Sequence, residues 1–186
     1  HPRNVPPSAV CEYSSVNGVI SAFGNFAIQI AKKYRLLKDG SNNSIYDTFR
    51  DRIMFPIWDQ YGKIIGHTSR ATKEKQVPKY LNSSESNIFN KKNLLYPYHL
   101  AKKHIREKDF LIICEGNMDA MMLHQYGHKN AVAIMGTAFN ESLIPSLISL
   151  SKNIYLALDN DPAGFQAGSR INEMFLKQGI ICKKIS

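Results

Sequence analysis

Short apolar runs alternate with helical patterns in the C-terminal part of the chain. Four runs are predicted strands: Phe110–Cys114, Ala131–Met135, Ile154–Leu158 and Ile180–Ile185. The segments between and after the first three have helical spacing: Met118–Gln125, Asn140–Leu150 and Pro162–Lys177. Strands that are apolar on both faces and alternate with helices indicate a parallel sheet covered by helices. We therefore predict a small α/β domain over residues 109–186.

The N-terminal part has a weaker pattern. Apolar residues three or four positions apart predict a helix over Phe26–Leu37. Further on, Ile53–Ile57 and Lys63–Thr68 flank the short segment Asp59–Gly62, which ends in glycine. Two such runs around a short turn are typical of a β-hairpin. The pattern does not place residues 8–25.

A polar, Lys-rich segment separates the hairpin from the predicted α/β domain. We expect residues 71–94 to cross the surface without regular structure, and Leu95–Glu107 to be helical with Pro97 in the first turn. Residues 1–108 are thus predicted to form a mixed α/β subdomain that precedes the parallel sheet.

Charge separates the same two parts. The chain has 186 residues, 44% of them hydrophobic, and a formal net charge of +9. Residues 1–108 contain 18 Lys and Arg against 8 Asp and Glu, whereas residues 109–186 contain 6 against 7. A basic body favours a polyanionic partner such as nucleic acid. A solvated Lys-rich surface explains the charge equally well.

Composition excludes several classes of protein. No apolar run approaches the ~20 residues that a membrane-spanning helix needs, so we expect no membrane partner. The three cysteines, Cys11, Cys114 and Cys182, form no CxxC pair, and we expect neither zinc nor a disulfide. We therefore expect the protein to reside in a reducing cytoplasm. Because the first residues hold no start Met and no signal-type apolar core, we expect a piece of a longer protein.

Acidic residues follow two of the predicted strands. Glu115 comes directly after the first, with Asp119 one helical turn on, and Asp159 and Asp161 come after the third. Ligands of open parallel sheets bind beyond the carboxyl ends of the strands. Carboxylates that converge there repel each other unless a cation lies between them, and Mg²⁺ prefers such oxygen ligands. This pattern predicts a divalent-metal site for phosphoryl transfer.

Local structural roles compete with this interpretation. Asp161 before Pro162 is also a typical helix N-cap, and Glu115 could simply stabilise a helix N-terminus. Neither alternative explains Asp159. The loop Gly136–Ala138 either offers backbone N–H groups to a phosphate or is an ordinary turn, and we expect His124 to pack rather than to bind a ligand.

The residues around these acids resemble a known family. Glu115-Gly116-Asn117-Met118-Asp119 and Asp159-Asn160-Asp161-Pro162-Ala163-Gly164 are similar to the paired signatures of a Toprim domain. Upstream motifs in the expected order resemble the bacterial DnaG-type DNA primases: Phe49–Ile57, the strand end Gly66–Arg70, Pro78–Ser83, Phe89–Lys91 and Leu95–Tyr96. An isolated acidic pair would be weak evidence, but an ordered series of motifs over residues 45–186 is specific.

The resemblance implies a set of site residues. Glu115, Asp159 and Asp161 would be catalytic and hold Mg²⁺, for which Mn²⁺ can substitute, and Asp119 would be a further or occasional ligand. Four residues of the basic subdomain would contact the triphosphate or the template: Arg70, Lys79, Asn82 and Lys91. For Arg50 and Arg52 an alternative is structural, as ion-pair partners of Asp47 or Asp51.

The family also implies partners and a fold. The fold is a Toprim-like parallel sheet, truncated at its C-terminal end and preceded by the basic subdomain. The partners are a single-stranded DNA template, ribonucleoside triphosphates, an RNA primer–DNA hybrid, and a replicative helicase bound through regions outside this chain. The expected reaction is synthesis of short RNA primers by two-metal phosphoryl transfer, although the isolated chain is expected to be weakly active or inactive. Alternatives are a Toprim nuclease or topoisomerase, or a non-catalytic nucleic-acid-binding module.

Overall fold

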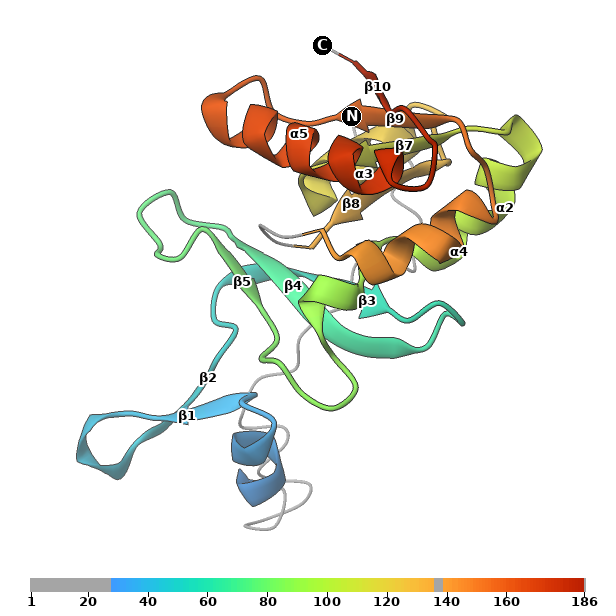
Figure 1. Cartoon of the computed structure of the whole chain (residues 1–186). Coiled ribbons are helices and arrows are strands. Elements are labelled where there is room, and N and C mark those ends of the chain that lie inside the picture. Colours follow the sequence, from blue (N-terminus) through green and yellow to red (C-terminus); the bar gives the residue numbers. More distant parts are fainter. Residues whose placement is uncertain (1–27, 136–138, 186) are drawn as a thin grey trace. The chain divides into compact units, whose positions relative to one another are not determined.

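The computed structural model describes residues 28–135 and 139–185 (Figure 1). They form two compact units. The first contains the described residues up to Ile57 together with Ile64–Phe89, and the second contains Trp58–Lys63 and the described residues from Asn90 onward. The mixed α/β class expected from the sequence is confirmed. The predicted domain boundary after residue 108 stays a prediction.

The described part of the first unit starts with a short helix and a two-stranded sheet. Residues 28–33 are helical, and β1 (Leu37–Asp39) pairs antiparallel with β2 (Ile45–Asp47), separated by the 3-10 turn η2 (Ser41–Asn43). The predicted helix Phe26–Leu37 is therefore too long. Arg35 adopts a left-handed conformation, with φ of 55°, which ends the helix before the strand. Phe26 lies outside the described residues.

The predicted hairpin is confirmed. It consists of β3 (Arg52–Trp58) and β4 (Ile64–Ala71). Asp59 organises the turn, because its Oδ1 accepts the backbone N–H groups of Tyr61 at 2.8 Å and Lys63 at 2.9 Å. These bonds lower the pKa of Asp59, and Gly62 supplies the left-handed conformation, with φ of 87°, that closes the turn.

The segment 71–94, predicted to lack regular structure, contains two short elements. Strand β5 (Tyr80–Asn82) pairs antiparallel with β4, and a 3-10 turn, η3 (Lys91–Asn93), lies further on. Both elements are only three residues long. Strand β5 is defined by its pairing with β4, and η3 by its N-cap. Neither element has a periodic pattern, so the sequence pattern did not show them.

The second unit is built on a five-stranded sheet in the order β10-β9-β7-β8-β6. Its strands are β6 (Leu95–Tyr96), β7 (Leu111–Cys114), β8 (Ala131–Ile134), β9 (Ile154–Ala157) and β10 (Lys183–Lys184). The last four run parallel, as predicted, although β10 is shorter than expected. Strand β6 is antiparallel to β8, so the helix predicted from Leu95 is wrong at its start.

Helices connect these strands. They are α2 (Tyr98–Lys108), α3 (Asn117–Gln125), α4 (Ile144–Ile148) after the 3-10 turn η4 (Glu141–Leu143), and α5 (Pro162–Leu176). The connection β7-α3-β8 runs in one direction along the sheet, and β8-α4-β9 and β9-α5-β10 run in the other. Because such crossovers are right-handed, α3 covers one face, and α4 and α5 cover the opposite face.

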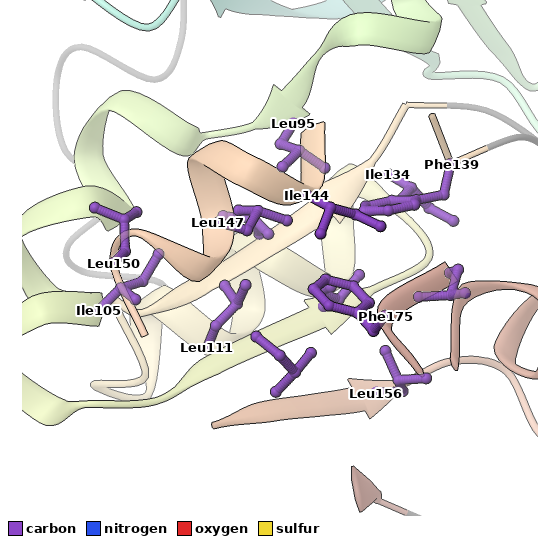
Figure 2. Packing of buried hydrophobic residues seen from close by; sticks show 14 of the residues in the cluster. Leu95, Ile105, Leu111, Ile134, Phe139, Ile144, Leu147, Leu150, Leu156 and Phe175 are labelled. Carbon is purple, nitrogen blue, oxygen red and sulfur yellow. The ribbon is translucent and has the colours of Figure 1, made fainter. Parts of the chain in front are cut away.

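The core of this unit lies between the sheet and the helices of one face. Figure 2 shows Ile144 and Leu147 of α4 and Phe175 of α5 packed around the sheet residue Leu111, and all four side chains are at most 1% exposed. Each such buried side chain contributes about 1.5–3 kcal/mol of transfer free energy. This packing holds the strand ends, and therefore the side chains that follow them, in fixed positions.

The described helices give no sign of membrane insertion, since none of them combines the length and the apolar character that crossing a bilayer needs.

Candidate active site

Two of the predicted acids meet at the carboxyl edge of the sheet. Strands β7 and β9 are parallel neighbours, with Cys114 opposite Ala157, so the chain leaves both strands at the same level. Glu115 follows β7 directly, and its Oε2 accepts a hydrogen bond from the backbone N–H of Asp159 at 3.4 Å. The structure therefore brings Glu115 and Asp159 together, as the strand positions predict.

The other two acids each bond to the start of a helix. Asp119 Oδ2 accepts the backbone N–H of Gly116 at 2.9 Å in the first turn of α3. Asp161 is the N-cap of α5, and its Oδ1 accepts the backbone N–H of Gly164 at 2.7 Å. The capping role that competed for Asp161 in the sequence is thus real, and it leaves Asp161 Oδ2 available to another partner.

Glycine at position 164 determines where Asp159 lies. A Cβ atom on Gly164 would overlap the backbone carbonyl group of Asp159. The first turn of α5 therefore lies directly against the backbone that carries this acid, an approach that only glycine permits. The short link between β9 and α5 is consequently held at both ends.

The donor chemistry of this edge fits a hard divalent cation. The Glu115 carboxylate lies against the backbone of Asp159, and Asp161 follows two residues later with one oxygen outside its cap bond. In the parts of the chain that the structure describes, no three His, Cys, Asp or Glu side chains lie together in an arrangement able to hold a metal ion. The full predicted ligand set, with Asp119, therefore stays a prediction.

Two other reactive side chains of this unit have structural roles. Cys114 is buried at the end of β7, burial raises its pKa to about 12, and its Sγ donates to the carbonyl of Val132 at 3.3 Å. Such a thiol is not a nucleophile near neutral pH. His124 Nε2 lies 2.8 Å from the carbonyl of Ala131, and burial lowers the pKa of the imidazole, so packing is the better interpretation, as predicted.

Three of the four predicted phosphate-contacting residues lie in the first unit. Arg70 lies opposite Tyr80, and Asn82 lies opposite Thr68, so Arg70 and Asn82 share one face of the β4–β5 pair. Arg70 and Lys79 are exposed, and the carbonyl of Lys79 accepts the backbone N–H of Ala71 at 2.8 Å. This end of the sheet thus presents two cations and an amide side chain.

Lys91 lies in the second unit, at the same sheet edge as the acids. It begins η3, whose N-cap Asn90 accepts the backbone N–H of Lys92 at 3.1 Å. Strand β6 follows at once, with Leu95 opposite Ile134, the last residue of β8. Because β6 is antiparallel, the residues before it lie at the carboxyl end of β8. Sequence periodicity could not show this, although an Asn before a short polar turn is a capping signal.

Two arginines have structural partners in the first unit. Arg52 Nη2 donates to the carbonyl of Pro78 at 2.7 Å, and the guanidinium of Arg50 lies 4.3 Å from the ring centroid of Tyr46. The acid next to them, Asp51, pairs instead with Lys73 at 2.6 Å, which lowers the pKa of Asp51. A structural role for Arg52 is thus favoured, but its partner is the carbonyl of Pro78 and not the expected Asp47 or Asp51. The loop Gly136–Ala138 lies outside the described residues.

Comparison with known proteins identifies close similarities to one group. The sequence-family model described as DNA primase catalytic core, N-terminal domain, matches residues 14–102. A second family model, described as Toprim-like, matches residues 112–186. A DNA primase of Helicobacter pylori is 42% identical over 141 residues, which cover 76% of this chain and 25% of that protein. The chain thus spans about a quarter of the length of such curated relatives.

Solved structures are similar over most of the chain. The primase of Aquifex aeolicus, described with its zinc-binding and RNA polymerase domains, has a TM-score of 0.81 at 28% identity, covering 95% of this chain and 44% of that one. A DnaG primase catalytic domain bound to single-stranded DNA has a TM-score of 0.79 at 34% identity, covering 90% and 56%. The fold of the chain therefore agrees with that of both structures.

Proposed function

Because the chain belongs to the bacterial DnaG-type DNA primase family, we propose that it forms the part of a primase that joins ribonucleotides on a single-stranded DNA template. The observation that supports this most directly is the pairing of Glu115 with the backbone of Asp159 at the carboxyl edge of the sheet. A Toprim-like match over the same residues adds to it.

Members of this family use a divalent metal. In our proposal Glu115, Asp159 and Asp161 hold Mg²⁺, which Mn²⁺ can replace, and Asp119 supports the turn through its bond to Gly116. When bound there, two such ions activate a 3′-hydroxyl and neutralise a triphosphate. The chain itself fixes the acids: Glu115 accepts a backbone N–H of Asp159, and Asp161 keeps one oxygen on the α5 cap.

In the proposal, the basic residues bind the phosphate groups of the template and of the triphosphate. Arg70 offers a planar guanidinium that can grip phosphate with two bonds, whereas Lys79 and Lys91 act as point charges on the template backbone or the triphosphate. Asn82, on the face of Arg70, adds amide hydrogen bonds to sugar or phosphate. A single-stranded template is the partner, as in the similar DnaG structure that was solved bound to single-stranded DNA.

Further partners follow from the same family. They are ribonucleoside triphosphates, the RNA primer–DNA hybrid that forms, and a replicative helicase contacted by other parts of the full-length protein. The proposed place of action is the bacterial cytoplasm, where replicating templates lie.

Neutralising one acid tests the proposal. We expect Asp159→Asn to abolish primer synthesis by a full-length primase that contains this chain, because it removes a carboxylate from the proposed metal site. The measurement is incorporation of labelled ribonucleotides on a single-stranded template with Mg²⁺. The matched control is Asp109→Asn, which neutralises an acid at the opposite, amino edge of the sheet. The backbone there is left-handed, with φ of 53°, and asparagine tolerates that conformation.

Undiminished synthesis by the Asp159→Asn protein would contradict the assignment of the site. The same assay without ribonucleotides separates the alternatives. Cleavage of the labelled strand would indicate a Toprim nuclease or topoisomerase instead, and DNA binding with neither cleavage nor extension would indicate a non-catalytic module.

A further inference from the structure

A side-chain hydrogen bond joins two loops at the carboxyl edge of the sheet. Asn140 Nδ2 donates to Asn93 Oδ1 at 2.5 Å, although the two residues are 47 positions apart in sequence. Asn140 Oδ1 is already engaged, because it accepts the backbone N–H of Ser142 at 3.0 Å and so caps η4. The cap therefore fixes the orientation of the Asn140 amide, and its NH₂ group is the one that faces Asn93.

Asn140 is held firmly on its side of the bond. It follows Phe139, whose side chain is 8% exposed, and it begins the η4–α4 segment. That segment is anchored by Ile144 and Leu147, which are buried in the core (Figure 2). The donor thus comes from a rigid part of the unit.

Asn93 ends the turn that carries Lys91. Within that turn the backbone N–H of Asn93 donates to the carbonyl of Asn90 at 3.1 Å, and the N–H of Leu94 donates to the carbonyl of Lys91 at 3.3 Å. The turn is closed by its own bonds, and only Leu94 separates Asn93 from the paired Leu95 of β6. Fixing Asn93 therefore fixes the backbone of Lys91.

The location gives this bond a functional meaning. Antiparallel pairing of β6 with the end of β8 places η3 at the carboxyl edge, and Glu115 and Asp159 leave the parallel strands at that same edge. We propose that Asn93 and Asn140 are positioning residues, which hold Lys91 where it meets the phosphate groups of a ribonucleoside triphosphate. This inference rests on the proposed function.

The physical reason is preorganisation. A lysine side chain is a flexible stem with a point charge, and it gives up conformational freedom when it binds a phosphate. A fixed backbone reduces that loss, whereas a loose turn adds to it. Neither asparagine needs to touch the nucleotide for this effect.

A double-mutant cycle measures the effect, with ATP and Mg²⁺ as the probe and calorimetry of the chain as the method. Asn93→Ala removes the acceptor from an exposed position, and Asn140→Ser removes the donor while keeping an N-cap residue. We expect each variant to bind ATP about fivefold more weakly, equivalent to about 1 kcal/mol. The double variant should lose no more than either single one, because both changes break the same bond.

Two further measurements decide between explanations. Lys91→Met should weaken ATP binding, and adding Asn93→Ala to it should change nothing more. If Lys91→Met leaves ATP binding unchanged, the proposed role of Lys91 is wrong. If Lys91→Met weakens binding but the asparagine variants keep normal affinity and only lower the melting temperature, the pair is purely structural and this inference is overturned.

Discussion

Gly164 shows how one residue can determine the geometry of the acid edge. Its missing side chain lets the first turn of α5 lie on the backbone of Asp159, while its N–H bonds to Asp161. Four residues on, Gly168 faces more open space, where a Cβ would be 3.4 Å from a methyl carbon of Leu158. The same substitution at these two positions of one helix should therefore have opposite effects.

We expect Gly164→Ala to destabilise the chain by about 1–3 kcal/mol, since the added methyl group forces backbone atoms apart. Gly168→Ala should be neutral or stabilise by up to about 1 kcal/mol, because alanine is the better helix former and its methyl group makes an ordinary contact. Urea unfolding of both variants measures the difference. Equal effects at the two positions would show that the close approach of α5 to Asp159 is not as described.

At the scale of elements, the tip of the β3–β4 hairpin packs on α2 through aromatic rings. Trp58 lies 4.7 Å from the imidazole of His99 and 6.1 Å from the ring of Tyr96, measured between ring centroids. Lys102 Nζ donates to the carbonyl of Gln60 at 2.6 Å. The Nδ1 atom of His99 is buried without a hydrogen-bond partner among the described residues. This contact therefore favours a neutral imidazole.

Acid should loosen that contact. Burial, and then the positive charge of Lys102, lower the pKa of His99 below its ordinary value near 6.5, and Asp59 raises it by less. A histidine whose pKa is lower in the folded state takes up its proton more readily when unfolded. The stability that depends on its neutral form is therefore complete above pH 6.5 and is lost as the pH falls through the lower, folded pKa.

Fluorescence can follow this change locally, because Trp58 is the only tryptophan of the chain. We expect the emission of Trp58 to change between pH 7.5 and 5 in the native protein, and to stay constant over that range in a His99→Gln variant. Two other histidines with lowered pKa, His67 and His124, affect overall stability but lie outside this aromatic cluster. A pH-dependent emission that survives in His99→Gln would assign the effect elsewhere.

The elements that the sequence predicted well are those that burial defines. Strands β7, β8 and β9 are apolar on both faces, so their composition shows them directly, and the acids that follow β7 and β9 could be placed at one edge from topology alone. Strand β6 has two residues and exists because Leu95 and Tyr96 pair with β8. The Asn93–Asn140 bond depends on side-chain orientation across 47 residues, which no local pattern contains.

At the scale of the whole molecule, positive charge is concentrated in one part of the chain. Residues 1–108 carry a net charge of +10, and the remainder carries −1. A template strand held by phosphate contacts releases counterions, so its affinity falls with salt in proportion to the number of contacts. The proposed function therefore predicts not only that single-stranded DNA binds, but which lysines and arginines determine the salt dependence.

We expect Arg70→Ala and Lys79→Ala each to weaken binding of an oligo(dT) strand and to reduce the slope of log affinity against log salt by about 0.7, the value for one contact to a single strand. The matched control is Lys152→Ala, an exposed lysine just before β9, at the amino edge of the sheet and opposite the acids. Its slope should equal that of the native chain. Fluorescence anisotropy of a labelled strand over a series of salt concentrations gives all four slopes. If the three variants lose affinity equally, the DNA responds to overall charge, and the exposed end of the β4–β5 pair is not the template surface.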